Sequence, residues 1–196
     1  MNFTNKIAKI FRIITIPPIL ALMLLLYLYF GLEGYFNAVY ELMIVAVCLV
    51  IMPALAYPIC FIVPSLKARG REAERSMAFV TTGIGYAVLV VPALALGFSE
   101  KLKIVCFTYV LSVIMLILFN KVLKLKASGH ACGVFGPLLM FMYVGGVMMI
   151  LPCAILLALT VWSSLRLKRH TVSELLFGGA CSGFALAVLA TIFYFI

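Results

Sequence analysis

The chain has no aspartate and few charged residues of any kind. Only 11% of its 196 residues are charged, against about 25% in ordinary soluble domains, and its six acidic residues are all glutamates. No stretch outside the apolar runs is long enough to bury a core of its own, which excludes a separate soluble domain. Binding of nucleic acid would need a folded basic face in water, and this composition provides none.

Metal-binding patterns are absent as well. None of the six cysteines belongs to a C-x-x-C pair, and all of them lie within or at the edge of apolar runs. Because free buried cysteine behaves as a small hydrophobic residue, we expect these side chains to serve packing.

Apolar residues dominate the chain instead, at 66% of the sequence with a mean hydropathy of +1.26. Apolar runs of about 20 residues, the length that crosses a bilayer as a helix, recur along the whole sequence. They predict an all-α, polytopic transmembrane bundle of about six or seven helices, forming a single integral membrane domain over residues 1–196. The expected spans are residues 13–30, 39–63, 77–97, 104–122, 131–147, 149–165 and 171–195.

Two of these spans come from one uncharged region, residues 131–165. Both of its flanks are basic, and basic flanks prefer the same side of the membrane, so the region should cross twice. Gly145-Gly146 and Pro152 mark a break in its middle, which predicts two short helices.

The positions of the cations predict an orientation. With seven crossings, all but two of the fifteen Lys and Arg residues fall on one side, and only Lys101 and Lys103 lie on the other. By the positive-inside rule the basic face is cytoplasmic, in the inner or plasma membrane of a prokaryote. The N-terminal cations Lys6, Lys9 and Arg12 agree with this orientation and precede a first span that we expect to be retained, because no small-residue cleavage site follows it.

The chain has only two histidines, and each stands beside a basic cluster at the end of an apolar run. His130 follows Lys121, Lys124 and Lys126, and His170 follows Arg166, Lys168 and Arg169. Histidine is the side chain that titrates near neutral pH, so its pairing with cations at a membrane edge indicates chemistry on an anionic lipid headgroup.

Three segments carry a resemblance to a known family. The motif Ser128-Gly129-His130 is preceded by Ala127, Ser163 is followed by His170 and Glu174, and Lys67 is followed by Arg75 and Ser76. Taken in their order along the chain, with the Lys67 segment first, they resemble the patterns K-x6-R-P, P-S-G-H and S-R-x5-H-x3-D of the type-2 phosphatidic-acid phosphatase superfamily, integral membrane lipid phosphatases. The resemblance covers about residues 60–195, with residues 1–59 forming two further membrane helices.

The resemblance implies a role for each matching residue. His170 would be the nucleophile that forms a phosphohistidine, His130 the general acid, and Glu174 the carboxylate that orients His170 from four residues along the same helix face. The phosphate would be bound by Lys67, Arg75, Ser128, Gly129, Arg166 and Arg169. The scheme requires neither a metal nor a cofactor, and its partners would be a lipid phosphate substrate and membrane lipids.

One departure from the pattern keeps alternatives open. The family's Arg after the matching serine is Ser164 here, and Arg166 or Arg169 would have to replace it. The expected function is therefore hydrolysis of phosphatidic acid, phosphatidylglycerophosphate or a polyprenyl phosphate or diphosphate. A relative that binds lipid phosphate without hydrolysing it is the first alternative. A small lipid transporter component, with Glu41 as a candidate residue if it is deeply buried, is the second.

Small residues in the last span predict close helix packing. Gly179 and Gly183 are four positions apart, with Gly178 and Ala180 beside them. Such a face serves either an intramolecular contact or a homodimer, and the sequence leaves both open.

Overall fold

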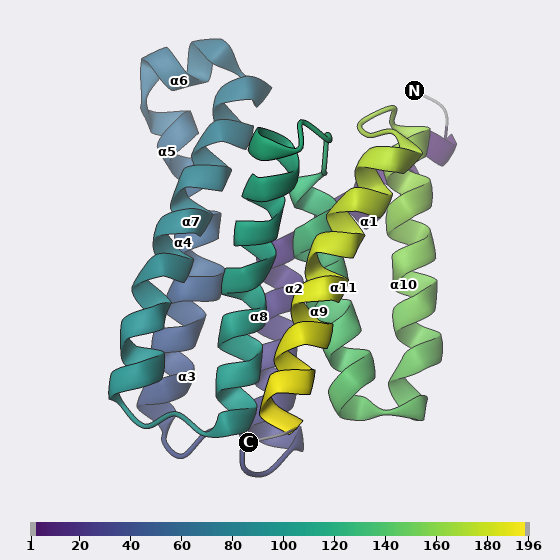
Figure 1. Cartoon of the computed structure of the whole chain (residues 1–196). Helices are drawn as coiled ribbons and strands as arrows, with labels where there is room; N and C mark the ends of the chain where they lie inside the picture. Colours follow the sequence, from purple (N-terminus) through teal and green to yellow (C-terminus); the bar gives the residue numbers. More distant parts are fainter. Residues whose placement is uncertain (1–2, 195–196) are drawn as a thin grey trace. The chain divides into compact units, whose positions relative to one another are not determined.

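The computed structural model describes residues 3–194, which form helices and no β-strand (Figure 1). Five helices in this range are long and apolar enough to cross a membrane, which confirms an all-α polytopic membrane protein. They are Val39–Ile62 (α3, η1, α4 and α5), Arg71–Ala95 (α7), Glu100–Val122 (α8 and η2), Val147–Arg166 (α10) and Val172–Tyr194 (α11). A short helix, α6 (Pro64–Arg69), connects α5 to α7.

The first predicted span is broken. It consists of α1 (Phe3–Ile14) and α2 (Pro17–Gly31), which are bent by 50° at the intervening break. Pro17 and Pro18 are the reason, because proline has no N–H for the preceding turn and disfavours helical geometry in the residue before it. The same prolines are well placed as the first residues of α2, where the backbone N–H groups have no helical acceptor.

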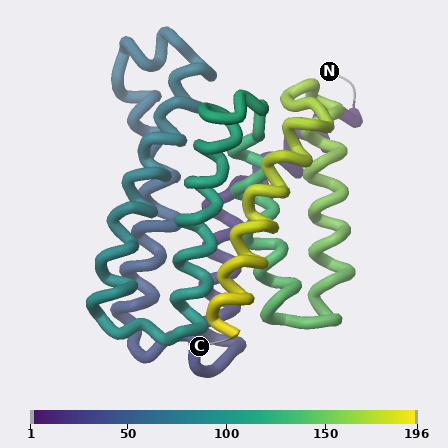
Figure 2. Tube along the Cα trace, viewed as in Figure 1, coloured from purple at the N-terminus to yellow at the C-terminus, as the bar shows by residue number. Residues whose placement is uncertain are grey.

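The uncharged region forms two helices, as predicted. The shorter, α9, spans Gly129–Gly145, and α10 begins at Val147. Gly146 separates them with a φ of 60°, a left-handed conformation that favours glycine. Figure 2 shows the chain reversing at this turn.

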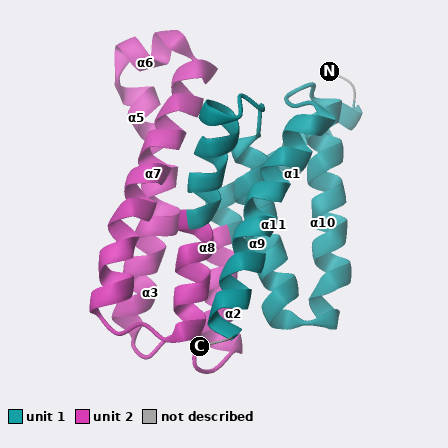
Figure 3. Cartoon of the chain, viewed as in Figure 1, with its two compact units in different colours: residues 1–20, 111–196 teal, residues 21–110 magenta. Residues whose placement is uncertain are grey.

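The chain divides into two compact units (Figure 3). Unit 1 comprises residues 1–20 and 111–196, and unit 2 comprises residues 21–110. Within unit 1, the start of α1, the loop before α9 and the loop between α10 and α11 lie at one end, and the turn at Gly146 lies at the other. Within unit 2, Arg71 and Arg75 begin α7, whereas Lys101 and Lys103 lie beyond its far end. The Lys and Arg residues of unit 1 thus lie at one of its ends, whereas unit 2 has cations at both ends of α7.

Unit 1 has its core between α9, α10 and α11. One buried cluster consists of Leu20, Val134, Leu138 and Cys153, and a second of Leu116, Cys132 and Cys181. All six cysteines of the chain are free thiols and buried, as expected of small hydrophobic residues.

The small-residue face of α11 lies against α9 within unit 1. A Cβ at Gly178 would overlap the Ser128 carbonyl oxygen and come within 2.8 Å of the Ala131 Cβ, and a Cβ at Gly179 would overlap the Phe135 ring. Glycine at these two positions lets the backbones approach closely, so the face serves an intramolecular contact.

Glu41 is fully buried in unit 2, in the first turn of α3. Its carboxylate accepts hydrogen bonds from the Asn37 backbone N–H at 2.8 Å and from the Asn37 side-chain amide at 3.3 Å. A carboxylate in this position satisfies N–H groups ahead of the helix and suits the positive end of the helix dipole. Capping of α3 therefore accounts for the burial of Glu41.

Candidate functional site

The site lies in unit 1, where the N-termini of α9 and α11 meet. The Ser128 backbone N–H donates to the Glu174 carbonyl oxygen at 2.9 Å, and Gly178 allows this close approach one turn further along α11. The two motifs from separate parts of the sequence are thus joined by a direct backbone hydrogen bond. Helix N-termini present N–H groups and a positive dipole, which favours an anion at this end of the unit.

Asn120 fixes the segment before Ser128. Its side-chain amide donates to the Ala127 carbonyl oxygen at 3.1 Å and accepts from the Ala127 N–H at 3.1 Å. Ser128 itself is the N-cap of α9, with its hydroxyl oxygen accepting from the Ala131 N–H at 3.2 Å. These contacts hold the start of α9 in place. The role of Asn120 was not predicted, because it depends on contacts with a loop seven residues further along the chain.

His170 lies between Glu174 and Ser128. Its Nδ1 is 3.2 Å from Glu174 Oε2, and its Nε2 is 3.4 Å from the Ser128 hydroxyl. A carboxylate at Nδ1 favours the tautomer with the proton on that nitrogen, which leaves a lone pair on Nε2. The predicted contact between His170 and Glu174 is present, and it presents the unprotonated nitrogen of His170 to the start of α9.

Glu174 also has a structural role. The same Oε2 accepts the Thr171 backbone N–H at 3.2 Å, and the Thr171 hydroxyl accepts the Glu174 N–H at 3.3 Å. This reciprocal pair is a capping box, which fixes the first turn of α11. The carboxylate that orients His170 is therefore rigidly held by the helix that carries it.

His130 faces His170. The two imidazole rings are nearly parallel, at an interplanar angle of 6° and a centroid separation of 6.4 Å. The Nε2 atom of His130 is buried and has no hydrogen-bond partner among the residues that the structure describes. Because a buried polar nitrogen without a partner is costly, this atom suits contact with a bound ligand.

The environment of His130 disfavours its charged form. His130 stands in the first turn of α9, ahead of the apolar stretch, and burial lowers its pKa to about 3, with further lowering by the positive charge of Arg12 and by His170. Since an ordinary histidine pKa is about 6.5, the unfolded chain takes up this proton first, and folding loses stability as pH falls below that value. A bound phosphate dianion would oppose these effects and raise the pKa.

We therefore expect the ring of His130 to stay neutral down to about pH 5 in the ligand-free protein and to gain a proton at higher pH when inorganic vanadate, a phosphate analogue, is bound. Nitrogen NMR of histidine-labelled protein in detergent measures this directly, because the chain has only two histidines. A His130→Gln variant assigns the signals. An ordinary titration in the free protein, or a titration that vanadate leaves unchanged, would contradict the arrangement.

A guanidinium that sequence reasoning missed belongs to this site. Arg12 Nη1 donates to the Ser164 hydroxyl at 3.4 Å, and its charge acts on His130. The sequence feature that could have identified Arg12 is its spacing from small residues on one helix face. Arg12 shares a face with Ala8 and Thr15, both fully buried, whereas Lys6 and Lys9 are exposed.

Two cations that follow Ser164 were expected to replace the arginine that the family pattern has at this position. Arg166 is the exposed last residue of α10, and Arg169 is half-buried, with its backbone N–H donating to the Ser164 carbonyl oxygen at 3.0 Å. Both remain candidates for phosphate binding by position, and Gly129 begins α9 beside Ser128.

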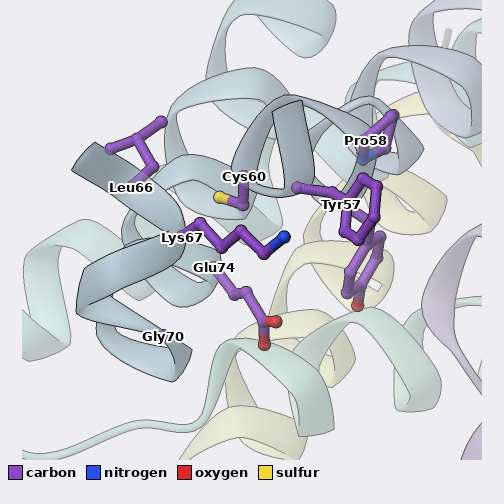
Figure 4. A pocket seen from close by; sticks show the side chains of 8 residues that line it. Tyr57, Pro58, Cys60, Leu66, Lys67, Gly70 and Glu74 are labelled. Atoms are coloured by element: carbon purple, nitrogen blue, oxygen red, sulfur yellow. The ribbon is translucent and has the colours of Figure 1, made fainter. Parts of the chain in front are cut away.

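Lys67 and Arg75 belong to unit 2, so their part in phosphate binding stays a prediction. Both are exposed, on α6 and α7. The Lys67 ammonium lies 4.5 Å from the centre of the Phe61 ring, and it projects with the Glu74 carboxylate into a pocket of this unit (Figure 4).

Within residues 3–194, no group of three or more His, Cys, Asp or Glu side chains is placed to hold a metal ion. Comparisons with models of protein families, with curated proteins and with solved structures found no significant match to the chain. The site must therefore be interpreted from its own residues.

Proposed function

We propose that this integral membrane protein is a lipid phosphate phosphatase with His170 as its nucleophile. The observation that carries the proposal is the alignment of Glu174, His170 and Ser128, which leaves the Nε2 lone pair of His170 directed at the start of α9. The carboxylate holds the orientation of the imidazole, and the helix N-terminus offers N–H groups to an anion. A phosphate-attacking histidine needs both.

The reaction proceeds in two steps. His170 Nε2 attacks phosphorus, the bond from phosphorus to the lipid oxygen breaks, and His130 donates a proton to the leaving oxygen. Water then attacks the phosphohistidine as His130 takes up a proton, which releases inorganic phosphate and restores both histidines. Proton transfer of this kind contributes about 10²–10⁴-fold to a rate.

The substrate is a phosphate carried by a lipid. The helices expose many large apolar side chains, such as Val147, Met148 and Leu176, so the molecule resides in the bilayer. Cations gather in the segments of unit 1 that flank the histidines, and such basic segments attract anionic lipid headgroups. The positive-inside rule favours a cytoplasmic site in a prokaryotic inner or plasma membrane, and such a site favours a phospholipid intermediate over a polyprenyl carrier.

The test is phosphate release by the purified protein in detergent, without added metal, from phosphatidic acid, phosphatidylglycerophosphate and undecaprenyl diphosphate. We expect release from the two phospholipids to exceed that from the polyprenyl lipid. A matched lipid with an unphosphorylated headgroup controls for detergent effects. Binding of the phospholipids without release would favour the non-hydrolysing relative. If the protein neither binds nor hydrolyses these lipids, both the phosphatase and the non-hydrolysing relative are excluded.

A further inference from the structure

The position that would carry an arginine in the family pattern is filled from another helix. Ser164 is fully buried in the last turn of α10, and the Arg12 guanidinium reaches its hydroxyl from α1, 152 positions earlier in the chain. Both residues belong to unit 1, so the contact lies within one compact unit. The Arg12 guanidinium thus lies beside the position at which the family pattern has an arginine.

The direction of Arg12 follows from the geometry of α1. Residues four and seven apart share a helix face, and the residues so spaced are Ala8, Arg12 and Thr15. Ala8 and Thr15 have no exposed surface, so this face of α1 lies against the protein. Small residues on either side of Arg12 leave room for its guanidinium to extend inward.

The neighbours of Arg12 suit an anion. The Arg12 Nη1 donates to the Ser164 hydroxyl at 3.4 Å, and the five N–H donors of a guanidinium allow it to bind several partners at once. Arg12 also acts electrostatically on His130, whose buried Nε2 has no partner among the described residues. Two groups able to donate to phosphate oxygens, Arg12 and His130, therefore interact with each other, and His130 faces His170.

We propose that Arg12 is a phosphate-binding residue of this site. From the N-terminal helix, it supplies the guanidinium that the family pattern places at the position of Ser164. The inference rests on the proposed phosphatase function. Ser164 acts as a positioning residue, because its hydroxyl accepts a hydrogen bond from the guanidinium and holds it beside the histidines. Arg12 stabilises the charge on the phosphoryl oxygens during attack by His170.

The experiment compares the wild-type protein with Arg12→Gln, with Lys9→Gln as the matched control and with the exchange variant Arg12→Ser/Ser164→Arg. We expect Arg12→Gln to lower kcat/KM by about tenfold to 100-fold, because hydrogen bonds to charged groups are strong. Lys9 is exposed on the same helix, so Lys9→Gln should change kcat/KM less than twofold. The exchange variant should recover at least part of the loss, which a purely structural role of Arg12 would not produce.

Binding of inorganic vanadate, measured by thermal shift on the same proteins, separates this inference from the phosphatase function. If the wild-type protein is active and Arg12→Gln is as active as Lys9→Gln, the role of Arg12 is overturned but the phosphatase function is retained. If the wild-type protein releases no phosphate, weaker vanadate binding in Arg12→Gln alone supports the anion site, and equal or absent binding overturns it. If Arg12→Gln fails to fold, Arg12→Lys takes its place in the experiment. This variant keeps the positive charge and should retain vanadate binding.

Discussion

His170→Asn is expected to abolish phosphate release, with a loss on the order of 10⁴-fold or more, because the variant lacks the nucleophile of the proposed mechanism. Asparagine keeps a polar group of similar size in contact with Glu174 and Ser128, so the fold should survive. The measurement is phosphate release from the preferred phospholipid, together with trapping of radiolabelled phosphate on the protein as an acid-labile, base-stable adduct. The adduct should form on the wild-type protein and not on the variant.

Two neighbouring substitutions make this result interpretable. Val172→Ala removes apolar bulk from an exposed side chain two residues away and should leave the rate within twofold of wild type. Glu174→Gln keeps an acceptor for His170 and Thr171 but removes the negative charge, so we expect a loss of about 10²-fold rather than complete inactivity. Full activity in His170→Asn would refute a phosphohistidine mechanism outright.

Gly178→Ala should lower both activity and stability. The added methyl group would overlap the Ser128 carbonyl oxygen, so α11 must move away from the start of α9. Displacements of about 1 Å at a reacting group cost about 10²-fold in rate, and overpacking of a well-packed interface costs about 1–3 kcal/mol. We expect a comparable loss of kcat/KM and a fall of several degrees in Tm, measured in the same detergent.

Gly183→Ala is the matched control for this change. It adds the same methyl group to the same helix, but the new Cβ would lie 3.6 Å from the Leu139 side chain, an ordinary packing distance. Its Tm should equal or exceed that of the wild type, since alanine favours helix more than glycine does. Equal behaviour of the two variants would show that the close approach at Gly178 does not hold the site together.

Hydropathy predicts the membrane-spanning part of a helix better than its ends. The span expected at residues 77–97 begins at Arg71 in the structure, because a helix can continue into the polar headgroup region with charged residues. Glu72 and Glu74 in its first turn favour this extension through the helix dipole. The break before Pro17 was harder to predict, since prolines near a helix start are compatible with one helix as well as with two.

The candidate site was predictable where its geometry is local. His170 and Glu174 are four residues apart, and that spacing predicts their contact, although His170 lies in the loop just before α11 and not on the helix as expected. The contact of Arg12 with Ser164 spans most of the chain and depends on how α1 packs, which no spacing in the sequence encodes. The charge of Arg12 also resembled a topology signal, because cations that orient a protein and cations that bind phosphate are found at the same membrane surface.

Unit 1 is assembled from two stretches that flank residues 21–110, and this has a consequence for synthesis in the cell. Synthesis proceeds from α1 towards α11, so Arg12 is made long before His170 and before Glu174 of α11, which contacts His170. The nascent chain has no complete site at any earlier stage. A chain that ends before α11 therefore has Arg12 but lacks Glu174, so the contact that orients His170 cannot form in it.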